Sequence, residues 1–178
     1  MILVVAATER ELEGASGAGT LACGIGPVEA AAATAQALAR ERPAALLHVG
    51  FAGARGIQVP QLVIGSEAIY EDAAAGAIVP THLRPDRQLL EAARRALPEA
   101  IVLPIGTSAR VGGTSGCQIE AMEGFAVLRA AQLANVPAVE VRAVSNEIDE
   151  AERGCWRFDE ALAALRSGLP LLLAEFRR

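Results

Sequence analysis

Short apolar runs alternate along the chain with Ala-rich segments whose apolar positions recur at helical spacing. The apolar runs predict buried strands, and the Ala-rich segments predict amphipathic helices. This alternation is typical of an α/β fold in which helices cover a central sheet. The predicted strands are Ile2–Ala7, Thr20–Cys23, Ala45–Val49, Leu62–Ile69, Ile101–Ile105 and Ala138–Val144.

Proline and glycine mark the ends of the predicted helices. Pro27 suits the first turn of a helix, because its missing N–H would be unpaired there in any case. Pro43 closes that helix, and the last helix is expected to break around Gly168 and Pro170. The predicted helices are Val28–Arg40, Arg87–Ala96, Ile119–Ala134 and Asp159–Phe176.

Length and composition are those of a globular chain. We expect 178 residues to form a single domain over 1–178, and 52% hydrophobic residues exclude a disordered segment. A net charge of −5, with no Lys at all, argues against a nucleic-acid-binding surface.

The scattered cysteines and the first residues of the chain exclude further classes of protein. Three distant cysteines and two distant histidines predict neither disulfides nor a metal site. The run Ile2–Ala7 is too short to cross a membrane, and no basic region precedes it as in a signal peptide. We therefore expect a cytoplasmic protein that binds no membrane.

Candidate functional residues follow the predicted strands, because ligands of α/β sheets gather where strands end and loops begin. No phosphate-binding loop, nucleophile elbow or dinucleotide fingerprint is present. The stretches that follow strands are Glu9–Glu11, Gly50–Gly53, Gly106–Gly116 and Ser145-Asn146.

Glu123 stands in an almost entirely apolar helical segment. A carboxylate is costly to bury there unless it is paired or hydrogen-bonded. It is a residue of the helix surface, a carboxylate paired with Arg142 or Arg129, or an acceptor of hydrogen bonds from ligand hydroxyls.

Asn146 and Glu11 each allow two interpretations as well. Asn146 is a turn or capping residue, or an amide that offers a ligand one donor and one acceptor. Glu11 is the capping-box partner of Thr8, or a general base for water, and these two roles are compatible.

Six short motifs, in order along nearly the whole chain, resemble the nucleoside phosphorylase and nucleosidase family, which includes the methylthioadenosine/adenosylhomocysteine nucleosidases. This resemblance implies a three-layer phosphorylase/hydrolase-like fold with a central mixed sheet flanked by helices. The motifs are Ile2–Glu11, Gly24–Ala31, Val49–Gly53, Val63–Asp72, Met122–Gly124 and Val141–Asn146.

The resemblance also implies roles for individual residues. Glu123 corresponds to the carboxylate that binds the ribose 2′- and 3′-hydroxyls, with Met122 packed against the sugar. Glu11 corresponds to the carboxylate that positions and deprotonates the attacking water. Further residues expected to line the pocket are Phe51, Ala52, Gly53 and the stretch Arg110–Gly113, which includes Val111 and Gly112. The family implies no cofactor, and a homo-oligomer that acts on a small purine nucleoside.

Two departures from the family pattern narrow the substrate. Asn146 stands where nucleosidases carry an Asp that protonates purine N7. An Asn can accept from N7–H and donate to a 6-oxo group, which favours hypoxanthine or guanine over adenine. Phe51 stands where phosphorylases place a hydroxyl that holds phosphate, which favours water as the nucleophile.

With these departures, the chain resembles the futalosine hydrolases of this family, which release hypoxanthine from futalosine in menaquinone biosynthesis. The predicted activity is therefore hydrolysis of an N-glycosidic bond. The alternatives are a purine nucleoside phosphorylase, a methylthioadenosine/adenosylhomocysteine nucleosidase, and a catalytically silent nucleoside-binding protein.

Overall fold

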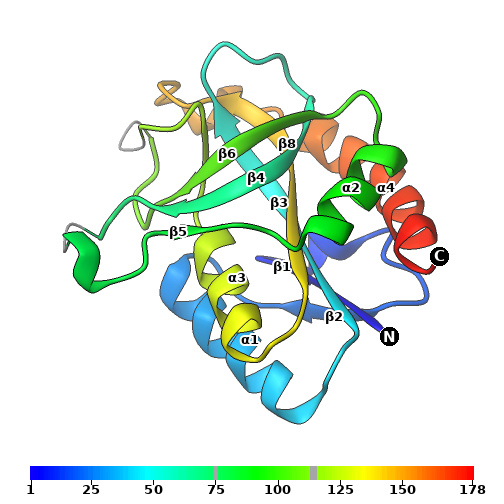
Figure 1. Ribbon diagram of the computed structural model, residues 1–178. Coiled ribbons are helices and arrows are strands. Elements are labelled where there is room, and N and C mark those ends of the chain that lie inside the picture. The colour runs from blue at the N-terminus through cyan, green and yellow to red at the C-terminus, as the bar shows by residue number, and fades with distance from the viewer. Residues whose placement is uncertain (74–75, 113–115) are drawn as a thin grey trace.

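The structure is a computed structural model that describes residues 1–73, 76–112 and 116–178. In this part of the chain, eight strands form one mixed sheet flanked by helices (Figure 1). The predicted α/β fold with a central mixed sheet is confirmed. The strands are β1 (Ile2–Ala6), β2 (Gly19–Ala22), β3 (Ala45–Ala54), β4 (Leu62–Tyr70), β5 (His82–Leu83), β6 (Ile101–Thr107), β7 (Ile119–Ala121) and β8 (Ala138–Glu147).

Five of the strands form a closed circuit. Its order is β3, β7, β6, β4 and β8, and β8 pairs with β3 to complete it. One apolar cluster lies within this circuit, built only from residues of these five strands: Ala52, Ala54, Val63, Ile105, Ile119, Ala121 and Val144. Because side chains alternate along a strand, the residues between these positions face outward.

The helices cover the rest of the sheet in two pairs (Figure 1). The first pair is α1 (Pro27–Arg40) with α3 (Gly124–Leu133), and the second is α2 (Arg87–Ala96) with α4 (Phe158–Phe176). Strand β1 is buried on both faces: Leu3 and Val5 belong to the core under the first pair, and Val4 belongs to the core under the second. A strand that is buried on both faces typically has a continuous run of apolar residues in its sequence.

Three of the predicted element boundaries are wrong. The stretch Gly50–Gly53, expected to be a loop, continues β3, and Ser145-Asn146 belongs to β8 instead of following it. The helix expected over Ile119–Ala134 is instead β7 followed by α3, with Glu123 as the N-cap between them. Strand pairing with β3 and β6 overrides the helical tendency at Ile119–Ala121.

The last helix also differs from expectation. It runs unbroken from Phe158 to Phe176 through Gly168 and Pro170. Gly168 packs closely against Leu62 and Leu97, where an added Cβ would lie 3.2 Å from the Leu62 side chain. Tertiary packing therefore decides the path of this helix. None of the helices in the described ranges is both long and apolar enough to cross a membrane.

Candidate active site

A cavity of about 550 Å³ opens where the parallel strands β1, β3 and β8 end. The short 3₁₀ helix Glu9–Leu12 follows β1 here, and the segment between β8 and α4 closes another side. Nine residues expected to form the site line this one cavity: Glu11, Phe51, Ala52, Gly53, Val111, Gly112, Met122, Glu123 and Asn146. Arg110 lines it too, while Gly113 of the same expected stretch lies outside the described residues.

Glu11 is buried and held in place by backbone and side-chain donors. Its Oε2 atom accepts from the N–H of Thr8 at 2.9 Å and from the Thr8 hydroxyl at 2.6 Å. Its Oε1 atom accepts from the N–H of Phe51 at 3.2 Å. The expected pairing of Thr8 with Glu11 is therefore present, and it orients a carboxylate that also lines the cavity.

Gly50 leaves room for two charged side chains that line the cavity to come close together. A Cβ at this position would lie 2.4 Å from Nη1 of Arg142 and 2.9 Å from Oε1 of Glu11. Real Cβ atoms do not approach so closely, so only glycine leaves room for both groups. The requirement here is for space, since Gly50 lies within β3.

Glu123 occupies the N-cap position of one helix, and its side chain reaches the start of another. It is the N-cap of α3, and its Oε1 atom accepts from the N–H of Gly26 at 3.0 Å, at the beginning of α1. Its Oε2 atom accepts from Nη1 and Nη2 of Arg142, each at 3.3 Å. The Arg142 partner considered from the sequence is thus correct, and Glu123 still lines the cavity.

Arg142 is fully buried and donates from every nitrogen of its guanidinium group. Besides Glu123, it donates from Nε to Oε1 of Glu140 at 2.8 Å and from Nη1 to the carbonyl oxygen of Phe51 at 3.3 Å. Its Nη2 lies 2.5 Å from Nε2 of His48, whose Nδ1 lies 3.0 Å from the carbonyl oxygen of Val5. These contacts assign the ring proton to Nδ1, so that neutral His48 accepts from Arg142.

Burial and charge shift the titration of this group of residues. Burial, with the nearby Arg142 charge, holds the pKa of His48 well below its ordinary value. Burial raises the pKa of Glu140, although Arg142 acts in the opposite direction. Burial, followed by the negative charge of Glu123, raises the pKa of the Cys23 thiol to about 11, so that this thiol stays protonated.

Asn146 is brought to the cavity by an irregularity in β8. The register with β3 passes from Ala52 opposite Val144 to Gly53 opposite Asn146, which leaves Ser145 as an extra residue. The Ser145 hydroxyl donates to Oδ1 of Asn146 at 2.7 Å, and Nδ2 donates to the carbonyl oxygen of Glu147 at 2.9 Å. One lone pair and one N–H of the amide remain for a ligand.

Aromatic side chains gather along another part of the cavity wall. The ring of Phe51 lies 5.2 Å from that of Phe158, which lies 5.5 Å from the ring of Trp156. The Arg153 guanidinium stands 5.8 Å from the centre of the Trp156 ring. Phe51 thus contributes an apolar surface to the cavity, and no side-chain hydrogen bond, as expected from its chemistry.

Several buried polar residues of this site were missed from the sequence. His48 and Glu120 are the polar residues of apolar stretches in β3 and β7. Glu140 and Arg142 are two positions apart and so share a face of β8. A charged residue inside an apolar strand is costly unless paired, and that signal could have marked them. Within the described residues, no group of three or more His, Cys, Asp or Glu side chains could hold a metal ion.

The family follows from a match that covers most of the chain. The model that describes the phosphorylase superfamily matches residues 19–171. The chain belongs to the phosphorylase superfamily. This membership agrees with the resemblance found in the sequence motifs, and it accounts for the mixed sheet with the cavity at its strand ends.

Relatives within this superfamily are similar over most of their length. The chain is 36% identical to the futalosine hydrolase of Streptomyces coelicolor over 176 residues, which span 82% of this chain and 74% of the relative. It is 29% identical to the 5′-methylthioadenosine/S-adenosylhomocysteine nucleosidase of Desulfotalea psychrophila over 160 residues, 75% of this chain and 68% of the relative.

Solved structures share the fold at lower identity. The MTA/SAH nucleosidase of Streptococcus pneumoniae, in complex with 8-aminoadenine, superposes with a TM-score of 0.84 at 24% identity, over 99% of this chain and 98% of that chain. A futalosine hydrolase mutant of Helicobacter pylori superposes with a TM-score of 0.86 at 15% identity, with the same coverage. These similarities establish the fold.

Proposed function

We propose that the chain hydrolyses the N-glycosidic bond of futalosine and releases hypoxanthine. The observation that carries this proposal is the convergence of Glu11, Glu123 and Asn146 on one cavity. That the chain is an enzyme of the N-glycosyl hydrolase class is confirmed by its relatives. The substrate and the residue roles that follow are our inference.

The two carboxylates suit two different tasks, binding of the ribose and activation of the attacking water. Glu123, held by Gly26 and Arg142, accepts hydrogen bonds from the ribose hydroxyls, and its charge stabilises the positive charge that develops on the sugar. Glu11 takes a proton from water as the water oxygen bonds to C1′. The bond from C1′ to N9 breaks, and its electron pair leaves with the base.

Asn146 stabilises the departing purine. Its carbonyl oxygen accepts from N7–H after a solvent proton reaches N7, and its amide N–H donates to the 6-oxo group. Adenine would place an amino group against that N–H. A mismatched buried polar contact costs about 1–3 kcal/mol, which is enough for at least tenfold discrimination.

Phe51 supports water over phosphate as the nucleophile. Its ring packs against Phe158 on the cavity wall, and its side chain has no group that could hold an anion. The backbone N–H of Phe51 already donates to Glu11. A phosphorylase would need donors at this place, so the contacts of Phe51 favour hydrolysis.

The function is tested by incubating the protein with futalosine, inosine and methylthioadenosine in phosphate-free buffer and measuring the free base. We expect hypoxanthine release from futalosine with no requirement for phosphate. Cleavage only when phosphate is added would assign a phosphorylase, and preferred release of adenine would assign the other nucleosidase. Nucleoside that is bound but left intact, with no base released, would assign a catalytically silent nucleoside-binding protein.

Exchange of Glu123 for Gln tests the sugar-binding role. We expect at least a tenfold loss of kcat/KM, because a neutral amide neither pairs with Arg142 as a carboxylate does nor stabilises positive charge on the sugar. The matched control is Glu41→Gln, the same exchange at an exposed position after α1. Wild-type turnover in Glu123→Gln would refute the role.

Further expectations accompany the proposed activity. We expect a cytoplasmic protein that acts in a pathway of menaquinone biosynthesis. We also expect a homo-oligomer, in which residues 1–178 of each chain form one domain. Light scattering of the purified protein measures the assembly directly, and a monomer at assay concentrations would remove that expectation.

A further inference from the structure

Positive side chains gather at the opening of the cavity. Three exposed arginines line it, Arg10, Arg110 and Arg153, whereas the acidic residues that line it are all buried: Glu11, Glu120 and Glu123. These cations oppose the net charge of −5 that the whole chain carries. A ligand with an anionic end is therefore attracted with that end toward the opening.

Arg153 differs from Arg10 in what its guanidinium group contacts. Nη2 of Arg10 donates to Oδ1 of Asp159 at 2.6 Å, so the Arg10 charge already has a carboxylate partner. Arg153 pairs with no carboxylate in the described part of the chain, and its guanidinium lies 5.8 Å from the centre of the Trp156 ring. A contact with a ring uses the face of the guanidinium group, so the N–H donors along its edge are available to an anion.

A row of aromatic rings connects Arg153 with the part of the cavity that holds Glu11. The row begins at Phe51, whose N–H donates to Oε1 of Glu11 at 3.2 Å. The ring of Phe158 lies 5.2 Å from that of Phe51, and the ring of Trp156 lies 5.5 Å from that of Phe158. All three rings line the cavity, so its wall offers an apolar surface that starts beside Glu11 and ends at a cation.

We infer that Arg153 binds a carboxylate at the end of an aromatic 5′-substituent of the nucleoside. This inference rests on the proposed function, in which Glu11, Glu123 and Asn146 surround the reacting bond. The substituent on C5′ is then the part of the substrate that extends along the aromatic rings. Futalosine carries a benzoate group at this end. Its ring packs on the aromatic wall, and its carboxylate accepts two parallel hydrogen bonds from one guanidinium group.

Arg153 acts on substrate binding and leaves the chemical step unchanged. It contacts a group at the far end of the substituent, where no charge develops as the bond from C1′ to N9 breaks. The contact is therefore equally strong in the bound substrate and in the transition state, so it lowers KM and leaves kcat the same. Inosine and methylthioadenosine carry no anion at this end, so they gain nothing from Arg153.

The test compares futalosine with its carboxamide, in which a neutral amide of the same shape replaces the carboxylate. Hydrogen bonds between two charged groups are stronger than those to a neutral amide, so the wild type should prefer futalosine about tenfold in kcat/KM. In Arg153→Gln we expect this ratio to fall close to one, through a higher KM for futalosine. A ratio that is the same in Arg153→Gln as in the wild type would overturn the inference.

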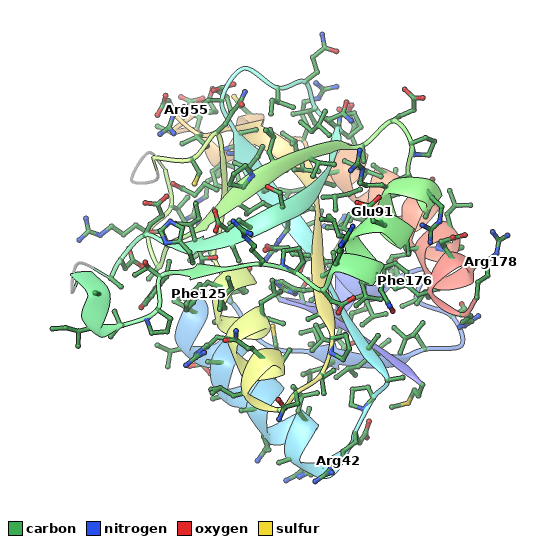
Figure 2. All side chains as sticks on the ribbon, viewed as in Figure 1. Arg42, Arg55, Glu91, Phe125, Phe176 and Arg178 are labelled. Atoms are coloured by element: carbon green, nitrogen blue, oxygen red, sulfur yellow. The ribbon has the colours of Figure 1, made fainter. Side chains whose placement is uncertain are left out.

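Two further variants show whether the contact or only the charge matters. Arg42→Gln removes the same charge at an exposed position on the periphery of the molecule (Figure 2), and its ratio should equal that of the wild type. Arg153→Lys keeps the charge but loses the planar pair of donors, so its ratio should lie between those of the wild type and Arg153→Gln. An equal fall in Arg42→Gln would indicate an effect of net charge alone and would contradict a contact at Arg153.

Calorimetry separates this inference from the proposed function, because binding does not require cleavage. The titrations use Glu11→Gln, which lacks the proposed base and so does not consume the ligand. This variant should bind futalosine about tenfold more tightly than the carboxamide, and addition of Arg153→Gln should make the two affinities alike. If this pattern holds but the wild type cleaves no futalosine, the proposed function fails and the role of Arg153 stands. If futalosine is cleaved but its advantage over the carboxamide persists in Arg153→Gln, the role of Arg153 is refuted.

Discussion

Arg142 and Arg157 each donate from Nε to a carboxylate close by in the sequence, in opposite surroundings. Arg142 on β8 donates to Glu140 at 2.8 Å, and both side chains are 1% exposed. Arg157 before α4 donates to Glu160 at 2.6 Å, and these side chains are 50% and 49% exposed. Other arginines, such as Arg42 and Arg178, project from the periphery of the molecule (Figure 2).

The difference between the two arginines is one of solvation. Water already stabilises the charges of the exposed pair, so their attraction adds little. The buried pair has lost that water, and Arg142 replaces it with contacts to Glu123, His48 and the Phe51 carbonyl. Burial lowers the pKa of Arg142, but the Glu140 and Glu123 charges outweigh this and raise it above its ordinary value.

A buried ion pair is weak evidence for a gain in stability, because desolvation offsets the attraction. The contacts of Arg142 instead hold Glu123 at the cavity and keep Phe51 in place. The buried cluster therefore serves to position the site, whereas the exposed pair joins only neighbouring residues. The following four experiments test this contrast, from the largest expected effect to the smallest.

Exchange of Arg142 for Leu should destabilise the protein by about 3–5 kcal/mol, because Glu123 and Glu140 would stay buried without a cation. Urea unfolding, followed by circular dichroism, measures the loss. The milder Arg142→Lys keeps the charge with fewer donors and serves if the Leu variant does not fold. If the free energy of unfolding fell by less than about 1 kcal/mol in either variant, the buried arginine would matter no more than an exposed one.

Exchange of Gly124 for Ala should cost about 1–3 kcal/mol, because a Cβ there would lie 2.3 Å from the Glu140 carboxylate oxygens. The matched test adds Glu140→Ala, which removes those oxygens. We expect the cost of Gly124→Ala to be much smaller in that background, a coupling that a double-mutant cycle of urea unfolding measures. Additive costs would show that Glu140 does not occupy this space.

Acid should destabilise the protein through His48. Its pKa is depressed in the folded state, so its contribution is present above the unfolded pKa of about 6.5 and is lost as pH falls below that value. Below that value the stability should fall with pH, by no more than about 1.4 kcal/mol per pH unit, the limit for a single proton. Urea unfolding of wild type and His48→Gln over this range should show a steeper dependence for the wild type; equal slopes would contradict a neutral buried ring.

Exchange of Glu160 for Gln should leave the urea midpoint unchanged. The exposed Arg157 guanidinium lowers the pKa of Glu160 by hydrogen bonding, but water solvates both groups in the folded and unfolded states. The exchange is the same in kind as Glu140→Gln, which alters the buried partner of Arg142. A large change of the urea midpoint in Glu160→Gln, or no change in Glu140→Gln, would contradict the difference between the exposed and the buried pair.

The elements of the fold could largely be predicted from the sequence. Helix Arg87–Ala96 has the expected bounds, and the strands that begin at Ile2, Ala45, Leu62 and Ile101 start where the apolar runs do. The errors include Gly50–Gly53 and Ile119–Ala121, beside Ser145-Asn146 and the helix break expected around Gly168 and Pro170. Glycine is typical of loops, and a short apolar run fits helix or strand equally, so only the neighbouring strands could decide these cases.

The site was predictable in its chemical groups but not in its contacts. Glu11, Glu123 and Asn146 were expected from motifs, and they do line one cavity. The sequence alone could not show that Arg142 donates hydrogen bonds to both His48 and Glu140. Nor could it show that Glu120 and Asn146 lie on the two strands that flank Gly53. These residues lie up to about a hundred positions apart, and their proximity depends on strand order.

The sequence by itself determined the α/β class, the sites of most helices and strands, and the acids and amides available for catalysis. These properties are local, since apolar spacing records which side of each element is buried. The tertiary structure alone decided that β3 and β8 lie side by side, that the extra residue Ser145 turns Asn146 toward the cavity, and that Arg142 is enclosed by Glu123, Glu140 and His48. Pairing among similar apolar strands depends on long-range packing, and the solvation of a charge depends on what that packing places around it.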